Sequence, residues 1–157
     1  MLLKYVEKEG KNFLYSVENI CCPSLSAKLF SKQFIGIFND SKDRGAYIVG
    51  KESVFTMANC PSCGDFVQIE MIPEWPNSPF QYRFIQKKEK TFCDEMTFCC
   101  KEMSQLLFGD STFRVVRPSD QKTHCELLLL CKGIQIPIEY CPQCGTEVIG
   151  GIETIPE

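Results

Sequence analysis

Two nearly identical cysteine turns constrain the fold of this 157-residue chain more than any other feature. One reads Cys-Pro-Ser-Cys-Gly at 60–64, and the other reads Cys-Pro-Gln-Cys-Gly at 141–145. Two thiolates three positions apart can grip one ion from a tight turn. The following glycine permits a positive φ, which lets backbone N–H groups point at sulfur. The pattern is typical of a zinc knuckle.

A double cysteine precedes each turn: Cys21-Cys22 precedes the first and Cys99-Cys100 precedes the second. Each pair lies just before an expected helix, whose N-terminal dipole favours thiolate. We therefore predict two metal sites, formed by Cys21, Cys22, Cys60 and Cys63 and by Cys99, Cys100, Cys141 and Cys144. In an alternative arrangement, one cysteine of each pair is buried in the core, leaving three sulfurs and another ligand.

Other uses of these cysteines are open but less favoured. Both turns together could form one zinc ribbon, although this needs a long insertion and leaves the double cysteines unexplained. Disulfides require an oxidising compartment, for which we see no signal. In thiol oxidoreductases a Cys-Pro-x-Cys motif begins a helix, whereas here glycine and strand-like residues follow. Four sulfurs in tetrahedral geometry suit zinc or iron, and we favour two zinc ions.

The remaining cysteines and the single histidine have no partner motif. We interpret Cys93, Cys125 and Cys131 as small core hydrophobes. His124 lies in a charged segment, and we expect it to be solvated rather than a ligand.

The chain also reads as a tandem duplication. Lys8, Lys11 and Phe13 align with Lys87, Lys90 and Phe92, and the double cysteines and knuckles follow in register. We predict two homologous zinc-ribbon-like modules, 1–76 and 80–157, joined at a proline-rich junction at 77–79. Proline in this stretch favours a stiff, extended connector.

Each module is expected to be a small α+β unit, with a mostly antiparallel sheet and a short helix. In the first, a hairpin at 2–7 and 12–17 precedes a helix at 23–31 and strands at 34–38, 47–49, 54–58 and 66–72. In the second, a helix ending at Gly109 precedes strands at 113–117, 126–130, 134–139 and 147–152. Modules this small bury little surface, and structural zinc can supply folding free energy on the order of 10 kcal/mol.

Nothing in the sequence predicts an enzyme. Catalytic zinc keeps an open coordination position, whereas all-cysteine sites are closed. We find no His-Glu-x-x-His motif, no phosphate-binding glycine loop and no Ser-His-Asp set. The paired acids Asp94-Glu95 and Asp40 with Asp43 are expected to be solvated. The metals are therefore expected to hold the fold together, and the function to lie in the surface.

Charge bears on the class of partner. The formal net charge is −3, and eight thiolates would add more negative charge than two zinc ions offset. Because phosphate affinity depends on cationic contacts, nucleic acid is disfavoured as a partner but stays the alternative. It would be supported by Lys87, Lys88 and Lys90, which also fit a solvated hairpin tip.

Protein binding is the stronger expectation for an acidic, metal-stapled double module. Trp75, Phe80 and Tyr82 at the junction are candidate contact residues, although packing between the halves is the better interpretation for them. The chain contains no apolar run approaching the ~20 residues of a membrane helix. Its N-terminus lacks the pattern of a signal peptide. We therefore expect a cytoplasmic protein without membrane contact.

The second half carries a family resemblance. Residues 98–103 read Phe-Cys-Cys-Lys-Glu-Met, and 140–145 read Tyr-Cys-Pro-Gln-Cys-Gly. Over about 98–150 this resembles small phage and prophage zinc-ribbon-like proteins with that signature. The first half resembles a diverged copy, with Asn59 in place of the tyrosine. The resemblance implies a mobile-element origin, a host-cell cytoplasmic setting and a binder that inhibits or assists host machinery, defence systems included.

Overall fold

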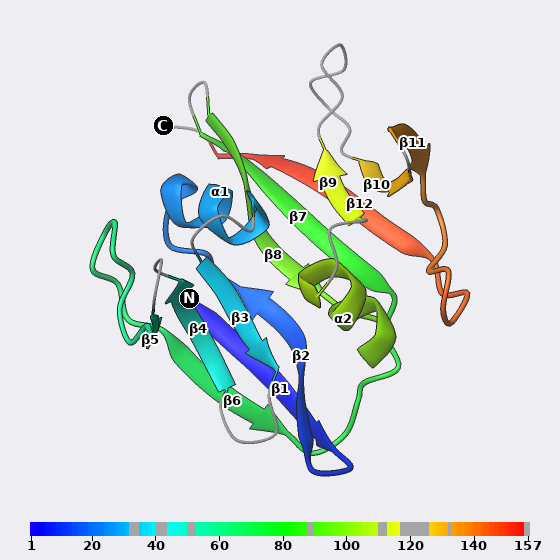
Figure 1. Ribbon diagram of the computed structural model, residues 1–157. Helices are drawn as coiled ribbons and strands as arrows, with labels where there is room; N and C mark the ends of the chain where they lie inside the picture. The colour runs from blue at the N-terminus through cyan, green and yellow to red at the C-terminus, as the bar shows by residue number, and fades with distance from the viewer. Residues whose placement is uncertain are drawn as a thin grey trace.

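Among the residues that the structure describes, strands dominate and the helices are short (Figure 1). The computed structural model describes residues 1–31, 35–39, 44–49, 53–87, 90–109, 113–116, 126–131 and 133–155. The first half contains β1 (Leu2–Lys8), β2 (Lys11–Glu18), α1 (Pro23–Ser31), β3 (Ile35–Asn39), β4 (Arg44–Val49), β5 (Val54–Thr56) and β6 (Gln68–Ile72). The second half contains β7 (Phe80–Lys87), β8 (Lys90–Thr97), α2 (Lys101–Gly109), β9 (Phe113–Val116), β10 (Glu126–Cys131), β11 (Ile134–Pro137) and β12 (Val148–Thr154). The predicted sheet-rich α+β class is confirmed, and the elements fall within a few residues of their expected places.

The central feature is one six-stranded sheet, with strand order β12-β7-β8-β2-β1-β6. Hairpins β1–β2 and β7–β8 are antiparallel, while β6 and β12 add in parallel to β1 and β7. Strands β2 and β8 join antiparallel, with Ser16 opposite Thr97 and Val17 opposite Met96. Because the order of equivalent strands is the same from either edge, an approximate twofold axis between β2 and β8 relates the two halves.

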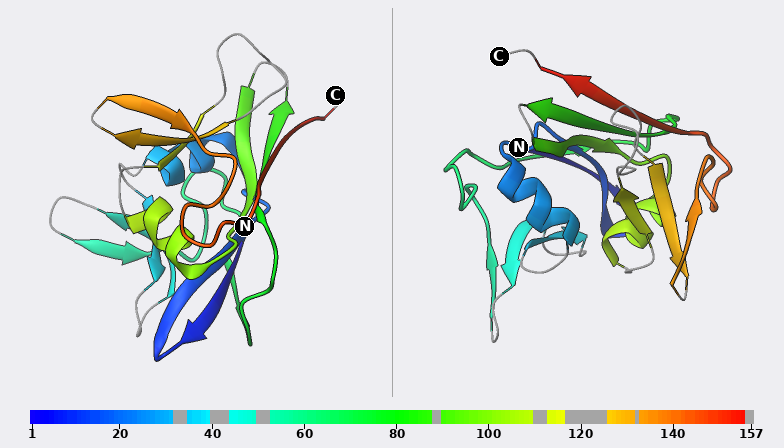
Figure 2. Two further views of the ribbon diagram at one scale, coloured as in Figure 1. Left: turned by 90° about the vertical axis from the view of Figure 1, so that its right-hand side faces the viewer. Right: turned by 90° about the horizontal axis from the view of Figure 1, so that it is seen from above.

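The shared sheet differs from the expectation of one sheet for each half. Joining the halves through β2 and β8 removes two open sheet edges and creates a single core from two halves that are each too small for one. Two further sheets of three strands, β3-β4-β5 and β11-β10-β9, belong to one half each. They lie with both helices on the same side of the central sheet (Figure 2).

Packing in the core crosses between the halves. Helix α1 packs against β8, and α2 packs against β2. Leu25 and Leu29 of α1 and Met103 of α2 are almost wholly buried, in one cluster that includes residues of both halves. Each helix therefore depends on a strand of the opposite half for its buried face.

The junction aromatics are buried or half-buried, and Trp75 packs between the halves as expected. Phe80 and Tyr82 are buried, and the Phe80 ring lies 5.5 Å from that of Phe98. Trp75 is half-buried, meets the Tyr15 ring edge-on at 5.6 Å, and donates its indole N–H to the Phe98 carbonyl at 3.1 Å. Trp75 therefore bridges the two halves, whereas Phe80 packs against Phe98 within the second half.

Equivalent β-bulges interrupt the two hairpins. In the first, Lys4 pairs with Ser16 and Tyr5 with Leu14, which leaves Tyr15 as the extra residue. In the second, the ladder shifts between Arg83 and Phe84, and Asp94 is the extra residue. A bulge leaves the extra residue outside the ladder, so its backbone groups are free for other partners.

The expectation of a solvated acid is wrong for Asp94, which is 6% exposed. Its carboxylate accepts a hydrogen bond from the Arg83 guanidinium, which also contacts Glu95 and Glu153. A buried carboxylate needs a charged partner of this kind, and the bulge at Asp94 lies beside Arg83 in the same hairpin. Asp40, Asp43 and Lys88 lie outside the described residues.

Candidate metal centres

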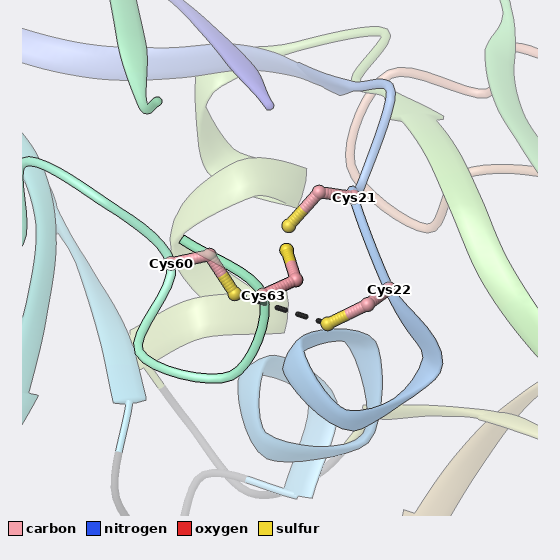
Figure 3. A group of neighbouring side chains, drawn as sticks. All are labelled: Cys21, Cys22, Cys60 and Cys63. Carbon is pink, nitrogen blue, oxygen red and sulfur yellow. Dashed lines mark hydrogen bonds between the residues drawn. The ribbon is translucent and has the colours of Figure 1, made fainter. Parts of the chain in front are cut away.

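Four cysteines in each half come together from two separate segments. In the first half, Cys21 and Cys22 lie between β2 and α1, whereas Cys60 and Cys63 lie in the turn between β5 and β6. Their sulfur atoms all lie within 4.8 Å of one another, and the four side chains converge (Figure 3). The second group meets the same limit and comprises Cys99, Cys100, Cys141 and Cys144.

Helix capping explains how adjacent cysteines can point into one group. Cys22 occupies the N-cap of α1: its carbonyl accepts from the Ser26 N–H at 3.1 Å, and its sulfur accepts from the Leu25 N–H at 3.4 Å. Cys100 caps α2 with the same contact, since the Met103 N–H lies 3.4 Å from its sulfur. An N-cap side chain satisfies a free amide, and the helix dipole stabilises a thiolate there. Both cysteines of each pair thus reach the four-thiol group. The alternative prediction, in which one cysteine of each pair lies in the core away from the group, does not describe this arrangement.

The knuckles have the geometry that their sequence predicts. In the first, the Gly64 N–H donates to the Cys60 carbonyl at 2.8 Å, and the Cys60 N–H donates to the Asp65 carbonyl at 2.7 Å. The second knuckle repeats both bonds. Gly64 and Gly145 have φ values of 81° and 74°, which side chains rarely tolerate. The Ser62 N–H points at the Cys60 sulfur at 3.4 Å.

The sulfur spacing fits a tetrahedral metal. Zinc bound to four thiolates at about 2.3 Å requires sulfur–sulfur edges of about 3.8 Å. The Cys22–Cys60 and Cys100–Cys141 sulfur atoms are each 3.8 Å apart, and those of Cys99 and Cys144 are 3.5 Å apart. All eight cysteines are free thiols. Each group could hold a metal ion, and four sulfurs would complete its coordination sphere.

Electrostatics in the first group favour one thiolate. Burial opposes ionisation of Cys60, but the backbone N–H groups of Ser62 and Cys63 outweigh it and lower the pKa of that thiol to about 7. Burial raises the pKa of Cys21, and its hydrogen bonds to Cys63 and Cys60 raise it further. Thiolates this close repel one another, so a dication is the natural means of ionising the whole set.

The second group follows the same logic with one extra donor. Burial raises the pKa of Cys99, and it raises that of Cys100 to about 12. Burial also opposes ionisation of Cys144, but the hydroxyl and backbone N–H of Thr146 lower its pKa to about 7. The Thr146 hydroxyl oxygen lies 3.1 Å from the Cys144 sulfur. The sequence analysis did not identify Thr146, because it compared features shared by the two halves and the first half has Asp65 at the equivalent position.

Within the described residues, the eight cysteines predicted as ligands form the only such groups. The two knuckles lie in different groups, as the two-site arrangement requires. A shared zinc ribbon would instead bring both knuckles into one group. Cys93 is 2% exposed and its thiol donates to the Glu95 carbonyl at 3.5 Å, in agreement with a core position. His124, Cys125 and the side chain of Cys131 lie outside the described part of the chain.

Comparisons of the chain with known protein families, with curated proteins and with solved structures found no match. Among the described residues, no helix is both long enough and apolar enough to cross a bilayer.

Proposed function

We propose that the protein is a non-enzymatic protein-binding module, built from two homologous halves, 1–76 and 80–157, that are each stapled by one zinc ion. The observation that carries this proposal is the pair of four-thiol groups, each with its sulfur atoms within 4.8 Å of one another. Four thiolates fill the tetrahedral sphere of zinc and leave no position for substrate or water. Iron suits the same ligands but ranks second.

Each ion would join the start of a helix to a knuckle far away in sequence. In the first half, the ion would tie the N-cap of α1 to the turn after β5, and in the second it would tie α2 to the turn after β11. Metal binding of this kind contributes about 10–16 kcal/mol to small zinc domains at neutral pH. A staple of that size suits halves whose own cores are small.

Exposed apolar side chains support a protein partner. Each of a set of large hydrophobic residues on β5, on β11 and beside the two knuckles is at least 46% exposed: Val54, Phe55, Phe66, Ile134, Ile136 and Tyr140. Strands β5 and β11 are edges of their sheets, so each keeps one row of backbone groups for another chain. Exposed apolar surface of this kind is typical of binding sites.

The biological setting of the proposal comes from the resemblance of residues 98–150 to phage and prophage zinc-ribbon-like proteins. We infer a mobile-element protein that acts in the host cytoplasm on a host protein, as an inhibitor or accessory factor, for example against a defence system. The net charge of −3 favours a protein partner over nucleic acid.

Elemental analysis of protein purified without added metal tests the zinc sites. We expect about two zinc ions for each chain, and about one in Cys22→Ser and in Cys100→Ser, because each variant removes a ligand from one group. Ser24→Ala is a matched control next to Cys22. About one ion, unaffected by either substitution, would point to a shared ribbon, and no metal would overturn the proposal.

A binding assay tests the surface. Host extract is passed over the loaded protein and over a Phe55→Ser/Ile136→Ser variant that retains both ions. We expect a specific protein to be retained by the parent and lost by the variant. Retention of duplex DNA that collapses steeply with salt, with no retained protein, would instead favour the nucleic-acid alternative.

A further inference from the structure

Each double cysteine is tethered to the opposite half of the molecule. The Ile20 N–H, next to Cys21, donates to the backbone carbonyl of Asp94 at 3.1 Å. The Phe98 N–H, next to Cys99, donates to the backbone carbonyl of Tyr15 at 2.8 Å. The two bonds occupy equivalent places about the approximate twofold axis. Each metal group is therefore positioned partly by a strand from the other half.

The acceptors of these bonds are the two bulge residues. Tyr15 and Asp94 are the extra residues of the two hairpins, so the strand ladder does not use their carbonyl groups in a regular pair. The bulges thus present free acceptors where the opposite double cysteine begins. Loss of either hairpin would leave the Ile20 or Phe98 N–H without its partner, and both residues are buried.

The helices reinforce this crossed arrangement. Helix α1, which begins at the first group, packs on β8, and α2, which begins at the second, packs on β2. Strand β8 ends at Thr97 and leads directly into Phe98 and the second double cysteine. Strand β2 ends at Glu18 and leads into Ile20 and the first. A metal ion that orders one cysteine group would therefore also order the strand that leads into the cysteines of the other group.

We propose that the two metal groups are thermodynamically coupled, so that an ion bound at one raises the affinity of the other. The inference rests on the proposed metal binding and adds a connection between the two sites. The protein would exchange between two states. In the docked state, residues 20–22 and 98–100 are each held by the hairpin of the opposite half, and in the undocked state they are not. Coupling must be equal in both directions, and the usual range for such coupling is about 5–150-fold.

Native mass spectrometry of the parent chain tests this directly, with Zn²⁺ added to half saturation. Two independent, equal sites would leave about half of the chains with one ion, and unequal sites would leave more. Tenfold coupling of equal sites lowers the singly loaded fraction to about a quarter, since empty and doubly loaded chains accumulate, and a tenfold difference in affinity between the sites raises it only to about a third. A singly loaded fraction of one half or more overturns the coupling.

Ligand variants provide a second measurement on the full chain. Cys63→Ser and Cys144→Ser each remove an exposed ligand from one group, and a chelator competition gives the Zn²⁺ affinity of the other. We expect the remaining site to bind Zn²⁺ about tenfold more weakly than the same site does in the parent when the other site is loaded. Ser62→Ala and Gln143→Ala, at equivalent turn positions, are controls that keep all eight thiols. Affinity within about twofold of the parent in both ligand variants would contradict the proposal.

Amide exchange separates coupling from simple loss of a ligand. In Cys63→Ser loaded with one Zn²⁺, we expect slower exchange of the Ile20 amide than in the empty variant, because the second site orders β8 and its Asp94 acceptor. Unchanged exchange at Ile20 would overturn the proposal. A parent that binds no zinc at all would instead refute the metal sites, whereas two independent ions would refute only the coupling.

Discussion

The two halves share one plan and fill the same space with different residues. In the first half, Leu3 of β1 lies opposite Ile69 of β6. At the equivalent place in the second half, Tyr82 of β7 lies opposite Gly150 of β12. The large ring of Tyr82 occupies the space of a missing side chain, since a Cβ on Gly150 would lie 2.2 Å from it. Neighbouring strands therefore divide the space beside this part of the sheet differently in the two halves.

A polar contact also distinguishes the halves. Tyr5 of β1 is fully buried, and its hydroxyl donates to the Gly45 carbonyl at 3.3 Å and accepts from the Gly45 N–H at 3.1 Å. This bond fixes β4 of the neighbouring three-stranded sheet to the central sheet. The second half has Phe84 at the equivalent position, without a hydroxyl. The shared skeleton is therefore reinforced by different local contacts in each half.

The largest effect should come from a buried metal ligand, whichever half it belongs to. We expect Cys60→Ser and Cys141→Ser each to lower the unfolding free energy of the zinc-loaded protein by more than about 4 kcal/mol. Because the core is shared, denaturant unfolding followed by fluorescence and circular dichroism should stay a single transition. Two separate transitions, with only one shifted, would mean that the halves fold independently.

The next effect concerns the Tyr82–Gly150 pair. We expect Gly150→Ala to destabilise the protein by about 2–3 kcal/mol, because the added carbon overlaps the Tyr82 ring. Gly151→Ala is a matched control, since a Cβ there meets nothing within 4 Å. Tyr82→Leu, which imitates Leu3, should remove most of the penalty in the double variant. Equal effects at the two glycines, measured by chemical denaturation, would contradict this steric explanation.

A smaller effect is expected when Tyr5 is converted to its counterpart. Tyr5→Phe should cost about 1–3 kcal/mol at pH 7, because the Gly45 N–H and carbonyl lose a buried partner. Phe84→Tyr is the matched control and should bring no gain. An unchanged denaturation midpoint in Tyr5→Phe would show that this contact does not stabilise the first half.

The Tyr5 hydroxyl also predicts a pH dependence. Burial raises the pKa of Tyr5 above its ordinary value of 10.0, so the folded state keeps a proton that the unfolded state releases. Stability from this group is therefore complete below about pH 10 and declines above it. The parent should lose more stability than Tyr5→Phe between about pH 9 and pH 11, measured by denaturation at each pH.

Sequence reasoning predicted local features well because their causes are local. Proline after Cys22 and the apolar spacing of Leu25 and Leu29 indicate α1, and the knuckles follow from their Cys-Pro-x-Cys-Gly turns. The eight cysteines that gather were those predicted, although their ligation of metal stays a prediction. These features depend on residues close together in the chain.

The shared sheet and the crossed tethers were not predicted, because their causes lie far apart in sequence. Nothing near Ser16 or Thr97 indicates that β2 will pair with β8. The bulge residues Tyr15 and Asp94 resemble ordinary strand positions, and Asp94 reads as a surface acid. Only the register of the hairpins reveals which carbonyl groups are left to accept a bond from the opposite half.

The smallest predicted effect concerns the residue after each knuckle glycine. Thr146 places a hydroxyl 3.1 Å from the Cys144 sulfur, whereas Asp65 carries a negative charge at the equivalent position near Cys63. A hydroxyl that donates to a ligating thiolate strengthens a metal site, and a nearby carboxylate weakens it. We therefore expect the second group to hold zinc about two- to tenfold more tightly than the first.

Exchanging these residues should reverse the difference. Asp65→Thr should strengthen the first site and Thr146→Asp should weaken the second, each by about two- to tenfold in a chelator competition with Zn²⁺. Each substitution is measured where the other site has lost its exposed ligand, Cys144→Ser for the first and Cys63→Ser for the second, so that the affinity belongs to one site. Asp65→Asn removes the charge without adding the hydroxyl, and should recover only part of the gain. If Asp65→Thr and Asp65→Asn leave the zinc affinity of the first site unchanged, that affinity is set by the backbone N–H groups around its sulfur atoms. The two halves would then differ in packing but not in zinc affinity.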